Sequence, residues 1–142
     1  MRLLDRLQSK QATTVKAFEL PEDSYRAVHG ESHYQPALHE TAKHATEEDG
    51  TRVFQAILVA EPDNEFDSNA IAVYSEAGKL GYIPRDDAPD YRPVFEEIAR
   101  QGCQAGVCTG RLVGGTPGKP SFGVVLRLSD PLSCLEELEK EA

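Results

Sequence analysis

The stretch Arg52-Val53-Phe54-Gln55-Ala56-Ile57-Leu58-Val59 has apolar side chains at both odd and even positions. Neighbouring residues of a β-strand point to opposite faces, so this run predicts a strand that is buried on both sides. A strand at the centre of a small barrel has this character. The stretch therefore indicates a β-rich fold built around it.

Shorter strand and turn signals flank this central strand. Thr46–Gly50 predicts a turn, Glu76–Gly78 predicts a hairpin turn, and the Gly- and Pro-containing segment Gly114–Pro120 predicts the loop of a second hairpin. After that loop, the even-numbered residues from Phe122 to Leu128 are apolar and share one face. The other predicted strands are Tyr25–Val28, Ala70–Tyr74, Lys79–Ile83, Gln104–Val113 and Ser121–Leu128.

Three stretches have the spacing of an amphipathic helix. The first is Pro36–His44. The second begins near Tyr91 and ends at Gly102, and Pro93 suits it only if that residue falls in the first turn. The third follows Asp130, which can cap a helix that begins with a proline. Its expected apolar side is formed by Leu132, Leu135 and Leu138.

The pattern predicts a mainly β fold of the α+β type: a small, partly open barrel of the OB-like or SH3-like kind. We expect one or two intervening helices and a short C-terminal helix, because about five short strands occur without a βαβ rhythm. We divide the chain into a peripheral segment (residues 1–22), a barrel domain (23–129) and an acidic C-terminal helix (130–142). Within the first segment, Leu3, Leu4 and Leu7 predict a short helical stripe.

Composition limits the partners that the protein can have. The chain has 142 residues, enough for one domain, and its 15 basic and 24 acidic residues give a net charge of −9. Such a charge opposes non-specific binding to duplex DNA, which depends on broad neutralisation of phosphates. A small site for a strand end needs only one or two cations and some aromatic rings.

The expected cellular location follows from two signals that the sequence lacks, a membrane span and an export signal. No apolar run approaches the ~18 residues of a membrane span, so we expect no membrane partner. Charges at Arg2, Asp5 and Arg6 interrupt the position of an export signal. The three cysteines, Cys103, Cys108 and Cys134, are therefore expected to be reduced thiols in a cytoplasmic protein.

Motifs for metals, nucleotides and catalysis are incomplete. Acids alternate along the polar segment Glu61–Asn69, but counting from Asp63 as the first position, a calcium loop would need glycine at Ser68 and glutamate at Tyr74. The histidines and cysteines lack the spacing of a zinc site. Gly118-Lys119 has neither the preceding glycine nor the following Ser or Thr of a phosphate loop. We therefore expect no metal, no cofactor and no enzymatic activity.

Three blocks together resemble the HIRAN domain, which is known at the N-terminus of DNA-repair helicases and as free-standing bacterial proteins. They are Val28–Tyr34 (VHGESHY), Glu61–Val73 (EPDNEFDSNAIAV) and Gly81–Arg85 (GYIPR). The resemblance extends from about Tyr25 to Leu128. It implies an OB-like barrel that captures the 3′ end of single-stranded DNA and serves DNA repair, with a separate helicase or nuclease as a possible partner.

The resemblance also assigns roles to residues. Aromatic rings hold the last bases and an acidic residue bonds the terminal hydroxyl, while two asparagines brace the loop. The implied DNA-binding residues are His33, Tyr34, Asn64, Phe66, Asp67, Asn69, Tyr82 and Arg85. The eukaryotic end-binders have an arginine followed by aromatic residues where this chain has Ser32-His33-Tyr34, which removes one cation and suggests an altered ligand preference.

Two other functions compete with end capture. A protein- or peptide-binding module is consistent with the acidic charge and the exposed strand edges of a small barrel. The least favoured alternative is a divalent-metal hydrolase built on Glu61, Asp63 and Asp67. Phe66, Tyr82 and Arg85 clustered in one open groove would favour DNA; buried rings with a groove along a strand edge would favour a peptide. Three converging carboxylates would favour the hydrolase.

Overall fold

The central strand of the computed structural model is β5 (Thr51–Ala60), as the sequence predicts. The structure describes residues 2–4 and 15–141, with side chains from residue 16 onward. Strand β5 pairs with β8 (Ala105–Thr116) along one edge and with β4 (Thr46–Glu48) and β6 (Ile71–Ser75) along the other. Ala56 and Leu58 enter the main core, and Ile57 enters a smaller cluster with Ala17 and Val107, so both faces of β5 are buried.

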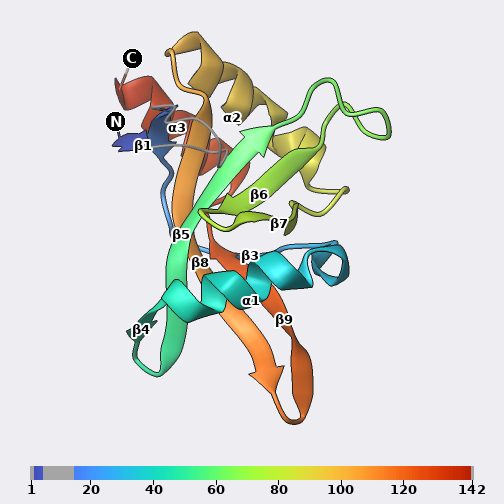
Figure 1. Ribbon diagram of the computed structural model, residues 1–142. Helices are drawn as coiled ribbons and strands as arrows, with labels where there is room; N and C mark the ends of the chain where they lie inside the picture. The colour runs from blue at the N-terminus through green and yellow to red at the C-terminus, as the bar shows by residue number, and fades with distance from the viewer. Residues whose placement is uncertain (1, 5–14, 142) are drawn as a thin grey trace.

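The sheet curls into a barrel-like shape. Strand β3 (Tyr25–Ala27) pairs with β9 (Lys119–Arg127), and the order continues through β8, β5 and β6 to β7 (Gly78–Tyr82). A single bridge joins the two ends, because the backbone N–H groups of His29 and Tyr82 each donate to the other's carbonyl at 2.8 Å. This mainly β, curled arrangement confirms the predicted OB-like class (Figure 1).

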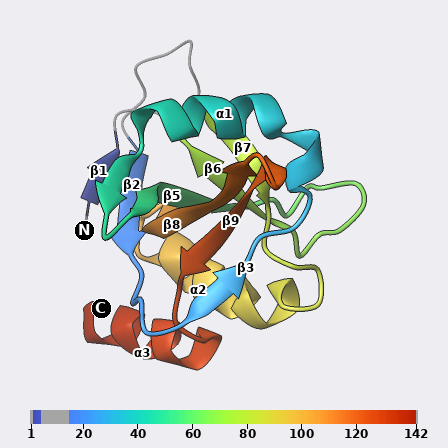
Figure 2. The same cartoon turned by 90° about the horizontal axis from the view of Figure 1, so that it is seen from below.

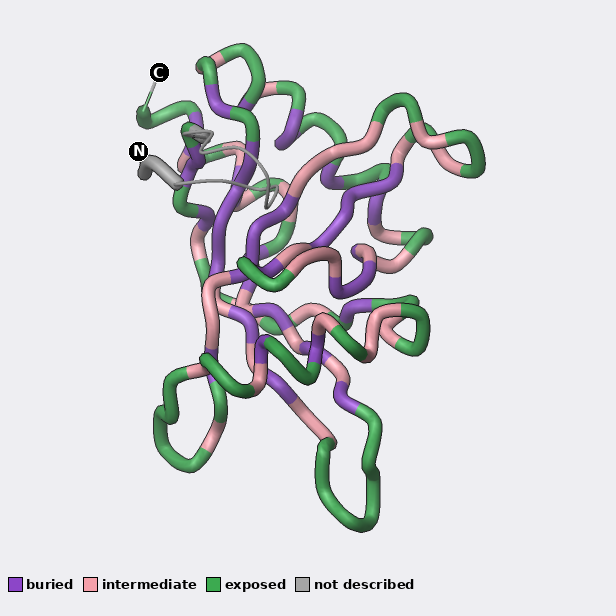
Figure 3. The backbone as a smooth tube through the Cα atoms, in the orientation of Figure 1, coloured by how far each residue is buried: buried purple, intermediate pink, exposed green. Residues whose placement is uncertain are grey.

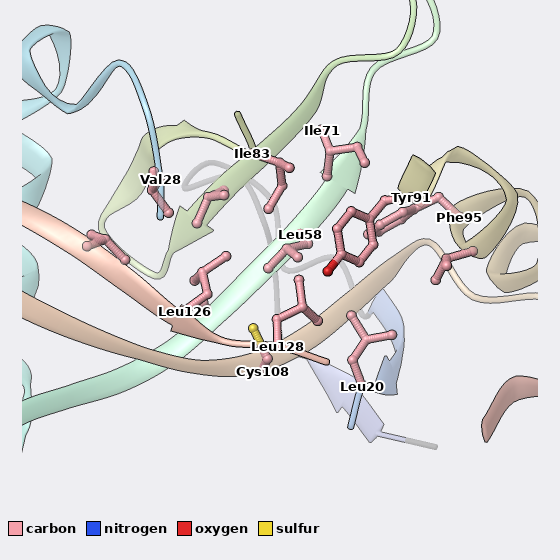
Figure 4. Close-up of a cluster of buried hydrophobic side chains, with 14 of the residues drawn as sticks. Leu20, Val28, Leu58, Ile71, Ile83, Tyr91, Phe95, Cys108, Leu126 and Leu128 are labelled. Atoms are coloured by element: carbon pink, nitrogen blue, oxygen red, sulfur yellow. The ribbon is translucent and has the colours of Figure 1, made fainter. Parts of the chain in front are cut away.

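Helices cover both sides of the curled strands. Helix α1 (Gln35–His44) lies on one side, and α2 (Ala88–Arg100) and α3 (Pro131–Glu141) lie on the other (Figure 2). Between the sheet and α2, Tyr91 packs with Leu58, Ile71 and Leu128 in the main core (Figure 4). No helix among the described residues is long and apolar enough to cross a membrane.

Tyr91 connects α2 to the segment that follows β9. Its hydroxyl donates to the Ser129 carbonyl at 2.7 Å. Burial raises the pKa of Tyr91 to about 12, so the phenol stays protonated and keeps donating this bond.

The N-terminal region differs from the sequence prediction. Leu3 and Leu4 lie in a strand, β1 (Arg2–Leu4), so the helical stripe is wrong, and Leu7 lies outside the described residues. Strand β2 (Val15–Glu19) pairs antiparallel with β1 and parallel with β8. Because Phe18 and Leu20 then enter the main core, this part of residues 1–22 is not peripheral.

Two predicted turns are largely strand. Thr46–Glu48 pairs with β5 as β4, which leaves the turn to Asp49 and Gly50, both with positive φ. The hairpin ladder of β8 and β9 continues as far as the pair Thr116–Lys119, so most of the predicted loop Gly114–Pro120 belongs to strands. Backbone pairing extends these strands beyond their apolar pattern. The structure describes nine strands, more than the approximately five that the pattern predicts. The hairpin tip projects away from the core and is exposed (Figure 3).

One helix boundary and one apolar helix face differ from the sequence prediction. Helix α2 begins at Ala88, so Pro93 lies inside the helix rather than in its first turn. Asp130 caps α3 as predicted, since its Oδ1 accepts from the Ser133 N–H at 2.8 Å. The buried residues of α3, however, are Cys134 and Leu138, whereas Leu132 is 68% exposed.

Candidate nucleic-acid interface

The polar loop between β5 and β6 is held in shape by its own side chains. Asn64 Oδ1 accepts from the backbone N–H groups of Phe66 at 2.9 Å and Asp67 at 3.0 Å. Asp67 Oδ1 accepts from the Asn69 N–H at 2.9 Å. Such Asx turns explain why Asn and Asp recur in this segment. They also leave the Phe66 ring pointing away from the core, with 84% of the residue exposed.

Glu61, at the start of this loop, forms a half-buried network with β7. Its carboxylate accepts from Lys79 Nζ at 2.8 Å and from the Tyr82 hydroxyl at 3.0 Å. Lys79 Nζ also donates to the Tyr82 hydroxyl at 2.8 Å, and Asn64 Nδ2 donates to Glu61 at 2.9 Å. The network ties the loop to the strand that carries Tyr82.

This network changes the acidity of its members. Burial alone would raise the pKa of Glu61, but hydrogen bonds from Lys79, Asn64 and Tyr82 outweigh it and lower that pKa. For Lys79, burial opposes the charged form, and the bonds to Glu61 and Tyr82 outweigh this effect and raise the pKa. Burial raises the pKa of Tyr82. The three groups are therefore held as carboxylate, ammonium and neutral phenol at neutral pH.

Arg85 brings a cation to the exposed side of the loop. Its Nη2 donates to the Phe66 carbonyl at 3.2 Å, and its Nε lies 3.8 Å from Asp67 Oδ2. The Arg85 side chain is 77% exposed and that of Asp67 is 20% exposed. An aromatic ring, a carboxylate and a guanidinium thus lie together on one surface.

Backbone packing places Tyr82 beside the first block of residues. A Cβ on Gly81 would lie 2.6 Å from the His29 carbonyl oxygen, so only glycine permits the close approach that the His29–Tyr82 bridge requires. In Figures 1 and 2 the loop after β5, the turn after β7 and the short helix η1 (Glu31–His33) all project on the same side of the molecule.

His33 and Tyr34 are less closely associated with the 61–70 loop. Their rings are in edge contact, with centroids 6.4 Å apart, and His33 is exposed. Glu31 fixes their helix to the sheet by accepting from the Val124 N–H at 3.0 Å. Among the described contacts, no hydrogen bond joins His33 or Tyr34 to the 61–70 loop, so the structure gathers Phe66, Asp67 and Arg85 more tightly than these two.

The metal-hydrolase alternative finds no support in the described part of the chain. No group of three or more His, Cys, Asp or Glu side chains there is arranged to hold a metal ion. Glu61 bonds Lys79 and Tyr82, while Asp67 faces Asn69 and Arg85. The three carboxylates that this alternative requires do not converge.

Two hollows in the described surface lie away from the 61–70 loop. Two hollows of about 420 and 540 Å³ flank β5 and share Thr46, Val53, Phe54 and Gln55 in their walls. None of the predicted DNA-binding residues lines either hollow. The candidate interface lies on the exposed surface, since Phe66 is 84% exposed and the Arg85 side chain is 77% exposed.

The sequence did not identify two cations of this surface, and it did not predict the structural role of Glu61. Lys79 and Arg92 carry no motif, and only their contacts with Glu61 and Asn69 show that they belong to this surface. Glu61 attracted attention as a possible metal ligand, whereas it anchors Tyr82.

One of the comparisons with known proteins gives a match. The family model of the HIRAN domain matches residues 27–122, which include every predicted site residue. No curated protein and no solved structure gives a significant match.

Proposed function

Because the chain belongs to the HIRAN domain family, a family of nucleic-acid-binding modules, we propose that it captures the 3′ end of single-stranded DNA. The observation that carries this proposal is the exposed Phe66 ring beside the Asp67 carboxylate and the Arg85 guanidinium. These are the groups that a strand end requires: a surface for a base, an acceptor for a hydroxyl and a cation for a phosphate.

Each group has a role that its surroundings permit. Phe66 stacks on a base, since its ring is free on the outside of a braced loop. Asp67 accepts a hydrogen bond from the terminal 3′ hydroxyl, and Arg85 donates to the adjacent phosphate. Asn64 and Asn69 hold the loop in shape.

Three further rings lie on the same side of the molecule. Tyr82 offers a second stacking surface, and its hydroxyl is held by Glu61 and Lys79. His33 and Tyr34 contact nucleotides farther from the end. The proposal for these two depends on the family resemblance more than on contacts with the loop.

We further propose that capture of strand ends serves DNA repair or processing, with a separate helicase or nuclease acting on the bound end. The matched family is a binding module rather than a catalytic domain. An end-binding module of this kind can present the end to another protein.

The 3′ terminus of the ligand tests the proposal. A 3′ phosphate removes the hydroxyl donor and puts roughly two negative charges beside Asp67. Losing a charge-assisted hydrogen bond costs about 1.5–3 kcal/mol, so binding of a labelled single strand should weaken at least about tenfold in fluorescence anisotropy. A 5′ phosphate on the same oligonucleotide should change little.

Asp67→Asn is the informative variant, because it keeps an acceptor and removes the charge. It should bind hydroxyl ends less tightly than the wild type and reject phosphate ends less strongly. Equal affinity of the wild-type protein for 3′-hydroxyl and 3′-phosphate strands would exclude end capture.

One observation favours a second candidate, a peptide-binding module. Between its partners β4 and β6, the edge of β5 at Phe54–Ala56 has no strand beside it in the described structure, and a hollow opens there. An extended peptide could add to such an edge. NMR titration separates the two functions, since a peptide would shift the amides of 54–56 and DNA those of 64–69.

A further inference from the structure

The 61–70 loop is contacted by a cation that belongs to none of the three sequence blocks. Arg92 lies on α2, and its Nη1 donates to Asn69 Oδ1 at 3.0 Å. Its side chain is 53% exposed, and its guanidinium has five N–H donors, more than its contacts with Asn69 and Glu96 use. Nothing in the packing of α2 requires an arginine here, because the buried face of that helix is formed by other residues.

A continuous series of contacts joins Arg92 to the carboxylate at the centre of the proposed site. Arg85 Nε lies 3.8 Å from Asp67 Oδ2, Asp67 Oδ1 accepts from the Asn69 N–H at 2.9 Å, and Asn69 Oδ1 accepts from Arg92. The two guanidinium groups therefore stand at the two ends of a short polar row with Asp67 within it. A strand whose terminal hydroxyl reaches Asp67 has its nearest phosphates beside this row.

We propose that Arg92 is a second phosphate-binding residue of this surface, acting with Arg85 on a neighbouring phosphate of the same strand. This inference rests on the proposed end-capture function. Arginine suits the role because its planar group can bond Asn69 and a phosphate oxygen at the same time. It supplies a cation in a chain whose net charge is −9.

Glu96, the carboxylate that pairs with Arg92 in the described structure, is a weak competitor. Glu96 Oε2 lies 3.3 Å from Arg92 Nε, and both side chains are 53% exposed. Exposed pairs of this kind contribute little, so a phosphate can replace Glu96. Glu96→Gln should therefore tighten strand binding by about twofold to fivefold.

Neutral linkages identify the phosphate that each arginine contacts. Single strands with a free 3′ hydroxyl are prepared with one methylphosphonate at each of the three linkages nearest that end. The wild-type protein should lose affinity at two of these linkages. Arg92→Ala should bind the natural strand about fivefold more weakly and become insensitive to one of the two, and Arg85→Ala should become insensitive to the other.

Three variants separate a phosphate contact from a bracing role. Arg92→Lys keeps the charge and should retain most of the affinity. Arg92→Gln keeps a donor for Asn69 without the charge, and should reduce the slope of log K against log salt by about 0.7, the value of one single-strand phosphate. Arg100→Ala is the matched control, since Arg100 is an exposed arginine of α2 that is also paired with a glutamate.

Different results would contradict the role of Arg92 and the end-capture function. If Arg92→Gln binds like the wild type with an unchanged salt slope, or if Arg92→Ala loses no more affinity than Arg100→Ala, Arg92 does not contact phosphate. End capture would still stand in that case. If the wild-type protein does not distinguish 3′-hydroxyl from 3′-phosphate strands, the proposed function fails, whatever Arg92 does.

Discussion

At the scale of single residues, Tyr82 joins the protein interior to the proposed DNA surface. Its hydroxyl bonds Glu61 and Lys79, and Lys79 Nζ lies 4.9 Å from the centre of its ring. The residue is half-buried, so removing the whole side chain affects both stability and binding. The ring and the hydroxyl can be tested separately.

Tyr82→Ala should weaken single-strand binding by about 1–3 kcal/mol, the usual value of one base–aromatic stack. Tyr82→Phe keeps the ring and should bind within about twofold of the wild type, although it loses the hydroxyl bonds and some thermal stability. Anisotropy and thermal melts measure the two effects. If the phenylalanine variant loses as much affinity as the alanine variant, the hydroxyl network rather than stacking carries the role of Tyr82.

At the scale of elements, the bridge between His29 and Tyr82 determines whether the proposed surface exists. It joins β7 to the segment after β3, and so places the GYIPR block beside the block that contains His33. Gly81 is the residue that allows the two backbones to approach. A methyl group there would also lie 2.7 Å from Val28 Cγ1 in the core.

Gly81→Ala should lower the free energy of unfolding by about 1–3 kcal/mol, the usual cost of overpacking, and should weaken DNA binding as well. Gly118→Ala is the control, since a Cβ at this exposed hairpin tip meets nothing within 4 Å. Denaturant melts should show little change for the control. A Gly81→Ala protein as stable as the wild type would show that the bridge tolerates a wider separation.

At the scale of the whole molecule, charge is unevenly distributed. The chain carries a net charge of −9, yet Lys79, Arg85 and Arg92 all contact one loop. Lys79 is bound to Glu61, which leaves two arginines for phosphates. Two available cations on an acidic protein favour contact with a strand end over binding along many phosphates of a DNA backbone.

The salt dependence of binding should therefore be shallow. Two phosphate contacts on a single strand predict a slope of about −1.4 for log K against log salt. A blunt duplex of the same length should bind far more weakly, because the net negative charge repels it and its 3′ ends are base-paired. A slope steeper than about −4, or equal affinity for the duplex, would contradict this picture of the charge distribution.

The sequence alone determined the parts of this protein that depend on local pattern. Apolar residues at both odd and even positions identified β5 as a strand buried on both faces, and Glu76–Gly78 indicated the hairpin turn between β6 and β7. The alternation from Phe122 to Leu126 correctly gave the buried face of β9. These features follow from the period of side-chain directions and from turn chemistry, both of which act over a few residues.

Tertiary structure alone decided which distant groups meet. Lys79 and Arg92 reach the loop from 18 and 23 residues beyond their partners Glu61 and Asn69, a relation that no local period encodes. Strand β2 belongs to the core because β9 leaves the β8 edge at Ala105–Val107 free for it. Local sequence determines the direction of each side chain along its own element, whereas curling of the sheet determines which elements come close enough to form a site.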